Sequence, residues 1–278
     1  MAEERRRCLT DSLVGVPAAL RSGARTSLRY PQLGGLLAAA GLVPLAGELG
    51  QRLGQQAATP GAGAGSALAI GGLYTLAMLA ILFFEAGVTG MIGQLLLGGR
   101  YTDKRLMQHG LRLFGRFVAL RLLCFLAFLP LMVMTVAPLA RFVFGELYDN
   151  RAAWTMETVT PFAGVYAGLL GIFVFVVEPI TRSSMALRDG GLLHALSDFG
   201  RFAAGHSAVV GVLALCGMLA SMWEFWYGSG SGVGALWPMA LYIILRAFVT
   251  VALAAAALEL YARWLAEHGV KLEADGLG

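Results

Sequence analysis

The chain has 278 residues, of which 58% are hydrophobic and 14% are charged, and its formal net charge is +4. Its mean hydropathy of +0.70 lies outside the range of ordinary soluble proteins, so we expect an all-α integral membrane protein. A basic isoelectric point near 9.1 would also suit nucleic-acid binding. Because the basic residues lie beside apolar segments, we expect anionic lipid headgroups as partners, and no nucleic acid.

Six apolar windows predict six transmembrane helices, since about 20 apolar residues cross a bilayer. The first window is short and rich in Gly and Ala. The second window is followed by further apolar sequence beyond Glu85, and the whole apolar stretch is too long for one straight crossing of the bilayer. Its three glycines at 87, 90 and 93 predict a bend or close helix packing. The windows are Leu33–Gly47, Ala67–Phe84, Leu122–Ala140, Pro161–Val177, Ala208–Trp223 and Ala235–Leu258.

The 21 Lys and Arg residues are distributed unevenly over the connections between these windows. One set of connections holds 16 of them, in segments 1–31, 99–120, 179–206 and 263–278. The other set holds only two, in segments 51–66, 145–160 and 227–234. Because positively charged connections stay on the cytoplasmic side, this distribution predicts that both termini are cytoplasmic.

A short repeat links the cytoplasmic segments. His109–Phe117 (HGLRLFGRF) and His194–Phe202 (HALSDFGRF) are identical at six of nine positions. A fainter copy, SLRY at 27–30, aligns Arg29 with the arginines of the other two copies. Each copy has the apolar periodicity of an amphipathic helix, which predicts interfacial helices over 13–29, 103–116 and 192–203.

The far end of each predicted unit carries a glutamate. The chain is therefore expected to be one membrane domain, 1–278, without a separate soluble domain. It would contain three units of an interfacial helix followed by a transmembrane hairpin, over roughly 11–90, 101–180 and 184–264. The glutamates are Glu85, Glu178 and Glu259.

Three tracts carry a family resemblance: the pattern ending LRYPQLGGLL, LMQHGLRLFGRFVALRLL, and EPITRSSMALRDGGLLHALSDFGRF. They resemble a loose bacterial superfamily of uncharacterised six-span proteins. That superfamily includes the membrane domain attached to some glycerophosphodiester phosphodiesterases, and it is distantly similar to the Yip family. The resemblance implies a bacterial membrane module that accompanies other functions. The phosphodiesterase chemistry of the fused relatives belongs to a separate soluble domain, for which this sequence has no counterpart.

Intramembrane charges are the first candidates for a functional site, because a charged side chain in hydrocarbon is costly. Glu85, Glu178 and Glu259 either surround a cation or proton site, or pair with arginines of the adjacent FGRF and LRY tracts, or reach interfacial water. Glu224 and Arg246 lie at similar depth on neighbouring antiparallel helices, which predicts an ion pair. Such a pair would lock the last hairpin or guard a pathway.

Basic stripes on the interfacial helices are the second set of candidates. They are expected to contact lipid headgroups or to act only during membrane insertion, and they comprise Arg21, Arg25, Arg29, Lys104, Arg105, Arg112, Arg116 and Arg201. His109 and His194 lack a second ligand at helical spacing, so no metal or other cofactor is expected. GSGSG at 228–232 and GAGAG at 61–65 lack the context of catalytic or phosphate-binding loops. We therefore expect no enzyme.

These patterns favour a non-catalytic accessory or scaffold module of the bacterial cytoplasmic membrane. It would engage lipids, together with a partner protein or a second copy of the chain. The alternative is a small transporter or channel that uses the intramembrane Glu and Arg residues. A transporter should enclose a polar cavity lined by those residues, whereas a scaffold should be packed solid.

Overall fold

The computed structural model describes residues 2–43, 63–144, 176–207, 209–211, 214–215 and 236–270. All regular secondary structure in these ranges is helical, which confirms the predicted all-α class for this part of the chain. The helices are α1 (Ala2–Arg29), a short helix over Pro31–Val43, α3 (Gly63–Leu96), α4 (Asp103–Phe144), α7 (Glu178–Arg188), α8 (Leu192–Gly205) and α10 (Leu236–Glu267).

Two helical stretches in these ranges are long and apolar enough to cross a bilayer, Thr75–Leu96 in α3 and Ala240–Glu267 in α10. The Pro31–Val43 helix is apolar but shorter, in line with its short window. The third predicted span falls on the continuous helix α4. Two further spans are predicted over Pro161–Val177 and Ala208–Trp223, and most of their residues lie outside the described ranges.

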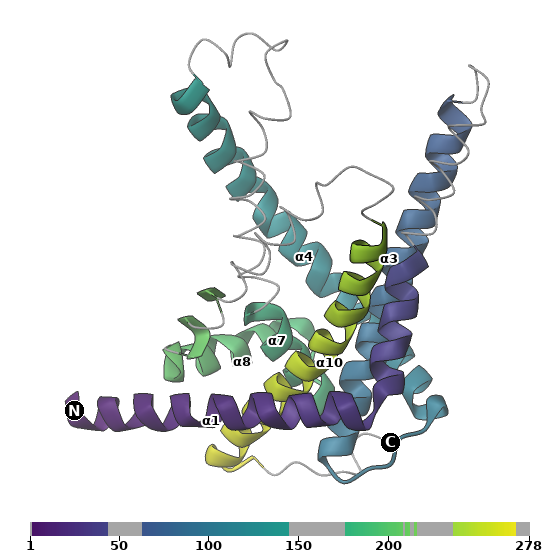
Figure 1. Cartoon of the computed structure of the whole chain (residues 1–278). Coiled ribbons are helices and arrows are strands. Elements are labelled where there is room, and N and C mark those ends of the chain that lie inside the picture. The colour runs from purple at the N-terminus through teal and green to yellow at the C-terminus, as the bar shows by residue number, and fades with distance from the viewer. Residues whose placement is uncertain are drawn as a thin grey trace.

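The first helix lies across the lower part of the molecule, whereas the Pro31–Val43 helix and α3 stand upright (Figure 1). The chain changes direction at Tyr30 and Pro31. A proline disfavours helical backbone at the residue before it and cannot donate a backbone hydrogen bond, so α1 ends here. The predicted first interfacial helix is therefore helical and distinct from the segment that follows it.

The second predicted interfacial helix is not a separate element. Residues 103–116 form the start of α4, which continues without interruption to Phe144. The tract FVALRLL after Arg116 contains no proline or glycine to end the helix. Division of this unit into a short interfacial helix and a separate span was therefore wrong.

Glycines in α3 allow close packing and do not break the helix. A Cβ on Gly87 would lie 2.8 Å from the Leu106 carbonyl oxygen, and one on Gly90 would lie 2.7 Å from His109 Cβ. Of the two predicted outcomes, close packing is the one observed at these positions, because α3 continues to Leu96. Glu85 therefore lies inside α3 and not at its end.

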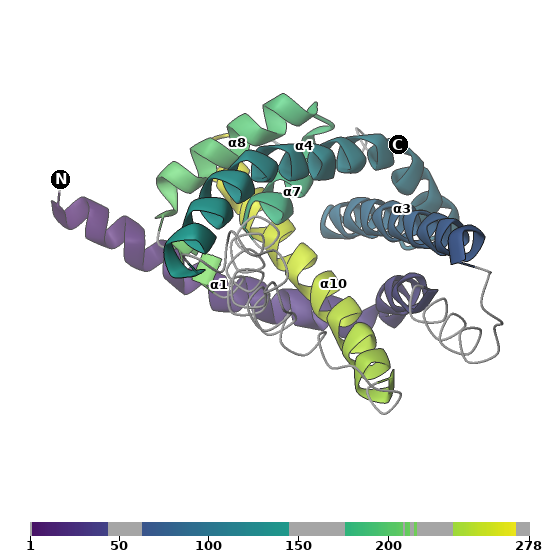
Figure 2. The same cartoon turned by 90° about the horizontal axis from the view of Figure 1, so that it is seen from above.

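α1 and α10 cross in direct contact (Figure 2). The contact face of α1 consists of small residues at i, i+4 spacing: Ala19 and Ser27 are 0% and 5% exposed, and Gly23 is buried between them. Ser27 Oγ donates a hydrogen bond to the Phe248 carbonyl oxygen at 3.0 Å. Small side chains let the two backbones approach closely, as in membrane helix pairs.

Gly23→Ala should destabilise this contact, because the new Cβ would lie 2.1 Å from the Ala252 carbonyl oxygen. We expect a loss of about 1–3 kcal/mol, the usual cost of overpacking, measured as thermal unfolding in detergent. Gly35→Ala is the matched control, because a Cβ at Gly35 meets nothing within 4 Å. Alanine favours helix by about 1 kcal/mol over glycine, so the control should be neutral or stabilising. Equal stability of the two variants would contradict the packing described above.

Candidate functional site

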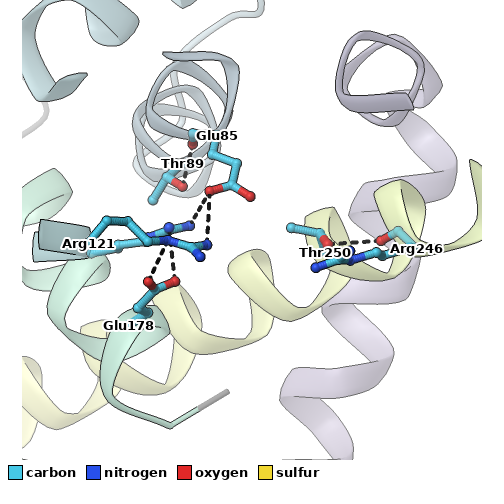
Figure 3. A network of polar contacts seen from close by, with 7 residues as sticks. Glu85, Thr89, Arg121, Glu178, Arg246 and Thr250 are labelled. Carbon is cyan, nitrogen blue, oxygen red and sulfur yellow. Dashed lines mark hydrogen bonds and ion pairs between the residues drawn. The ribbon is translucent and has the colours of Figure 1, made fainter. Parts of the chain in front are cut away.

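Four charged side chains from three helices meet in the interior (Figure 3). Arg182 of α7 lies 2.9 Å from a carboxylate oxygen of Glu85 on α3 and 2.9 Å from one of Glu178 on α7. Arg121 of α4 approaches the same two carboxylates, at 2.6 Å for Glu178 and 3.7 Å for Glu85. We call these four residues the charge cluster.

Local helical geometry sets the positions of these side chains. Glu178 and Arg182 are one turn apart, at i, i+4 spacing in α7, and therefore lie on the same helical face. The Arg182 guanidinium also lies over the Phe117 ring, 4.7 Å from its centroid. Since Phe117 precedes Arg121 by one turn, the same face of α4 supplies both an aromatic and an ionic contact to Arg182.

Burial makes the balance of charge decisive here. The Glu178, Arg182 and Glu85 side chains are 3%, 10% and 14% exposed, and only Arg121 is more accessible, at 34%. Two carboxylates face two guanidinium groups, so the cluster is neutral as a whole. In a medium of low dielectric constant, loss of one partner leaves an uncompensated charge. The arrangement therefore holds α3, α4 and α7 in one relative position.

The structure brings together two of the three predicted glutamates. Glu85 and Glu178 share the charge cluster, whereas Glu259 pairs with Arg263 on its own helix. The partners Arg121 and Arg182 are not arginines of the FGRF or LRY tracts. In the FGRF tract of α4, Arg116 pairs with Asp189 instead.

The predicted Glu224–Arg246 pair stays a prediction, because Glu224 lies outside the described residues. Arg246 is exposed on α10, and its carbonyl oxygen accepts a hydrogen bond from the Thr250 hydroxyl at 2.9 Å.

Arg121 and Arg182 were missed as site residues by sequence reasoning. Arg182 was counted among the charges of a cytoplasmic connection, yet it is 8% exposed. Its i, i+4 spacing from Glu178, in the tract EPITR, was an available signal for an ion pair. Arg121 lies at the edge of the predicted span Leu122–Ala140, but its partners lie far away in sequence and could not be identified from spacing.

Glu178→Gln and Arg182→Gln should each destabilise the protein by about 3–5 kcal/mol, because each leaves an unbalanced buried charge. The double variant should lose less than the sum, since Glu85 and Arg121 still neutralise each other. Thermal or denaturant unfolding in detergent measures this coupling.

Glu259 and Arg263 provide the matched control, with the same i, i+4 spacing on a more exposed surface. Exposed pairs of this kind contribute about 0.3–0.5 kcal/mol, so Glu259→Gln and Arg263→Gln should have small effects. Strictly additive losses at Glu178 and Arg182 would show that the charge cluster is not energetically coupled.

A second polar centre joins α7, α8 and α10 around Asp198, which is fully buried. Its carboxylate accepts hydrogen bonds from the Tyr261 hydroxyl at 2.6 Å, the Ser184 hydroxyl at 2.8 Å and Arg188 Nη1 at 3.2 Å. Burial disfavours the charged form of Asp198, but these donors and the Arg188 charge outweigh it and hold the pKa of the Asp198 carboxyl below its usual value. Asp198 thereby anchors α8.

His109 joins α3 to α4 in the buried interface. It is 4% exposed, and its Nε2–H donates to Gln94 Oε1 at 3.2 Å. Burial, assisted by the nearby positive charges of Arg112 and Arg105, lowers the pKa of His109 from 6.5 to about 4. His109 is therefore neutral near pH 7 and serves as a hydrogen-bonded packing residue.

The stability of the protein should fall on acidification because of His109. Unfolding releases His109 to its ordinary pKa of 6.5, so the unfolded chain takes up a proton that the folded protein excludes. The contribution is complete above pH 6.5 and is lost as the pH falls toward 4, by up to about 3 kcal/mol. His109→Gln should flatten the dependence of the unfolding temperature on pH between 7.5 and 5. An unchanged pH dependence in His109→Gln would contradict this assignment.

Within the described residues, no group of three or more His, Cys, Asp or Glu side chains is placed to hold a metal ion. Comparisons of the chain with protein-family models, with curated proteins and with solved structures found no match. The family resemblance carried by the sequence tracts therefore stays a prediction, and the function must be argued from the geometry of the chain itself.

Proposed function

We propose that this chain is a non-catalytic, six-span accessory or scaffold module of the bacterial cytoplasmic membrane, with both termini in the cytoplasm. In this proposal its interfacial helices engage anionic lipids, and a partner protein or a second copy binds within the membrane. The observation that carries the proposal is the division of the surface of α1 into three faces.

The three faces of α1 have different chemistry. One face packs on α10 through Ala19, Gly23 and Ser27. A second face is apolar yet exposed: Leu20 and Leu28 are 41% and 78% exposed. The third is an exposed basic stripe of Arg21, Arg25 and Arg29. A helix that anchors to protein on one side and presents leucine beside arginine on the other sides fits a lipid–water interface.

The same order of faces recurs on α4 and α8. An α-helix turns by about 100° per residue. Around the axis of each helix, the buried face is followed by the exposed apolar face and then by the basic face, in the same rotational sense as on α1. Leu111 of α4 and Leu193 of α8 are 74% and 80% exposed. Arg105 and Arg201 are exposed on the basic faces, and Lys104 is exposed in the first turn of α4. This agreement supports three related interfacial surfaces and the predicted internal repeat.

The charge cluster supports a scaffold more than a transporter. Both of its carboxylates are paired with guanidinium groups and are largely shielded from solvent. A transport pathway requires a charged group that can exchange its partners, whereas this balanced arrangement favours one fixed packing of α3, α4 and α7. Transport through the cluster remains the second candidate function, because costly buried charges within apolar helices are typical of ion pathways.

Changing Arg21, Arg25 and Arg29 together to Gln should weaken binding to anionic lipid. Each cation near anionic headgroups contributes about 1 kcal/mol of binding free energy, so the triple variant should lose much of its affinity for anionic lipid. Retention of co-purified anionic lipid and thermal stabilisation by anionic vesicles are suitable measurements. An unchanged lipid response would leave the stripe only a role in membrane insertion.

The matched control changes Arg5, Arg6 and Arg7 to Gln, which removes the same charge from consecutive positions in α1. Cysteine labelling verifies that topology is intact. In a variant without the native cysteines, a cysteine substituted for Ala62, Asn150 or Gly230 should react with a membrane-impermeant thiol reagent added outside the cell. A cysteine substituted for Asp103, Asp189 or Glu273 should not react with this reagent.

A further inference from the structure

Arg112 and Arg116 of α4 converge on a single carboxylate at the corner between α7 and α8. Arg116 Nη1 lies 2.5 Å from Asp189 Oδ1, and Arg112 Nε lies 3.9 Å from the same oxygen. Two guanidinium groups thus share one carboxylate, and one positive charge is left without a close counterion in this group. The three side chains are 25%, 31% and 47% exposed for Arg112, Arg116 and Asp189, so they lie within reach of the surface.

Arg112 has unused hydrogen-bonding capacity. Its Nε and Nη2 atoms are buried and have no hydrogen-bond acceptor in the structure. These two nitrogens form the edge with which arginine binds two oxygens of a phosphate or carboxylate at once. A buried guanidinium edge without an acceptor is costly, and a ligand with two oxygens would remove that cost.

The surroundings of this arginine pair match an amphipathic ligand. Met107 and Leu111 of α4 are 48% and 74% exposed and, at about 100° per residue, lie on a different face of the helix from the two arginines. On the same helix, Arg105 extends the basic face toward the first turn. The low pKa of His109, due first to burial and then to Arg112 and Arg105, is consistent with a positive local field. A helix surface that carries both exposed apolar side chains and arginines suits an amphipathic anion such as a phospholipid.

We propose that Arg112 and Arg116 bind the phosphate of an anionic phospholipid, which takes the place of the Asp189 carboxylate. This inference rests on the proposed lipid-engaging function and assigns one saturable headgroup site to it. The phosphate would accept hydrogen bonds from Nε and Nη2 of Arg112 and from the Arg116 guanidinium. Asp189 would be released toward solvent.

Asp189 makes the proposal testable by a gain of binding. Its φ of +49° is left-handed, a conformation that asparagine also adopts readily. Asp189→Asn therefore keeps the backbone and removes the competing charge. Binding of dioctanoyl phosphatidylglycerol to the full-length protein in uncharged detergent, measured by calorimetry, should become about 5-fold tighter, as expected for about 1 kcal/mol.

The double variant Arg112→Lys with Arg116→Lys tests the chemistry of the site. It keeps the charge but loses the two-pronged edge, so binding should weaken about 10-fold or more. Dioctanoyl phosphatidylcholine is the zwitterionic control and should bind more weakly than phosphatidylglycerol. Inorganic phosphate distinguishes a free anion from a lipid: equal affinity for both would overturn the lipid assignment.

Either of two results would overturn the headgroup site. One is phosphatidylglycerol binding that is unchanged or weaker in Asp189→Asn, and the other is unchanged binding in the lysine double variant. Unfolding curves without lipid show whether each variant is folded, and a variant that fails to fold cannot produce the expected gain. The change of Arg21, Arg25 and Arg29 to Gln should leave this saturable site intact. Failure of the headgroup site is thereby distinguished from failure of the broader lipid-engaging function, which that triple variant tests with vesicles.

Discussion

The relative positions of α3, α4 and α7 depend on the electrical neutrality of the four side chains in the charge cluster. The charge cluster joins Glu85 of α3, Arg121 of α4 and the Glu178–Arg182 pair of α7, and each charge requires the others to be tolerable where it is shielded from solvent. Apolar packing alone has little directional preference between membrane helices. The ion pairs supply that direction, because a rotation of any of the three helices would separate charges.

Much of the helical architecture could be predicted from periodicity and from prolines. The amphipathic pattern of residues 13–29 predicted the end of α1, and Pro31 gives a local physical reason for that end. The continuity of α4 beyond Arg116 is equally local, since no proline or glycine occurs between Arg116 and Pro130, yet its amphipathic first half was given too much weight. Close approach at Gly87 and Gly90 was also anticipated from the sequence.

The candidate site could be predicted only in part. Glutamates within apolar sequence attract attention because their burial is costly, and two of the three do meet. The i, i+4 spacing of Glu178 and Arg182 was a usable signal for one pair, but the partners of Glu85 could not be found, since its distance from Arg182 depends on helix packing and not on sequence spacing. The apolar face of α1 was recognised, but the small residues that bind α10 were not, because leucines outweigh alanine and glycine in any hydropathy pattern.

The unbroken course of α4 gives the molecule a mechanical property. Its 42 residues span about 63 Å along the helix axis, roughly twice the thickness of the hydrocarbon core of a bilayer. Arg112 and Arg116 lie near one end of this helix and Arg121 lies further along it. No proline interrupts the helix between Arg112 and Arg121, so a movement of this end of α4 is transmitted along hydrogen-bonded backbone to the charge cluster.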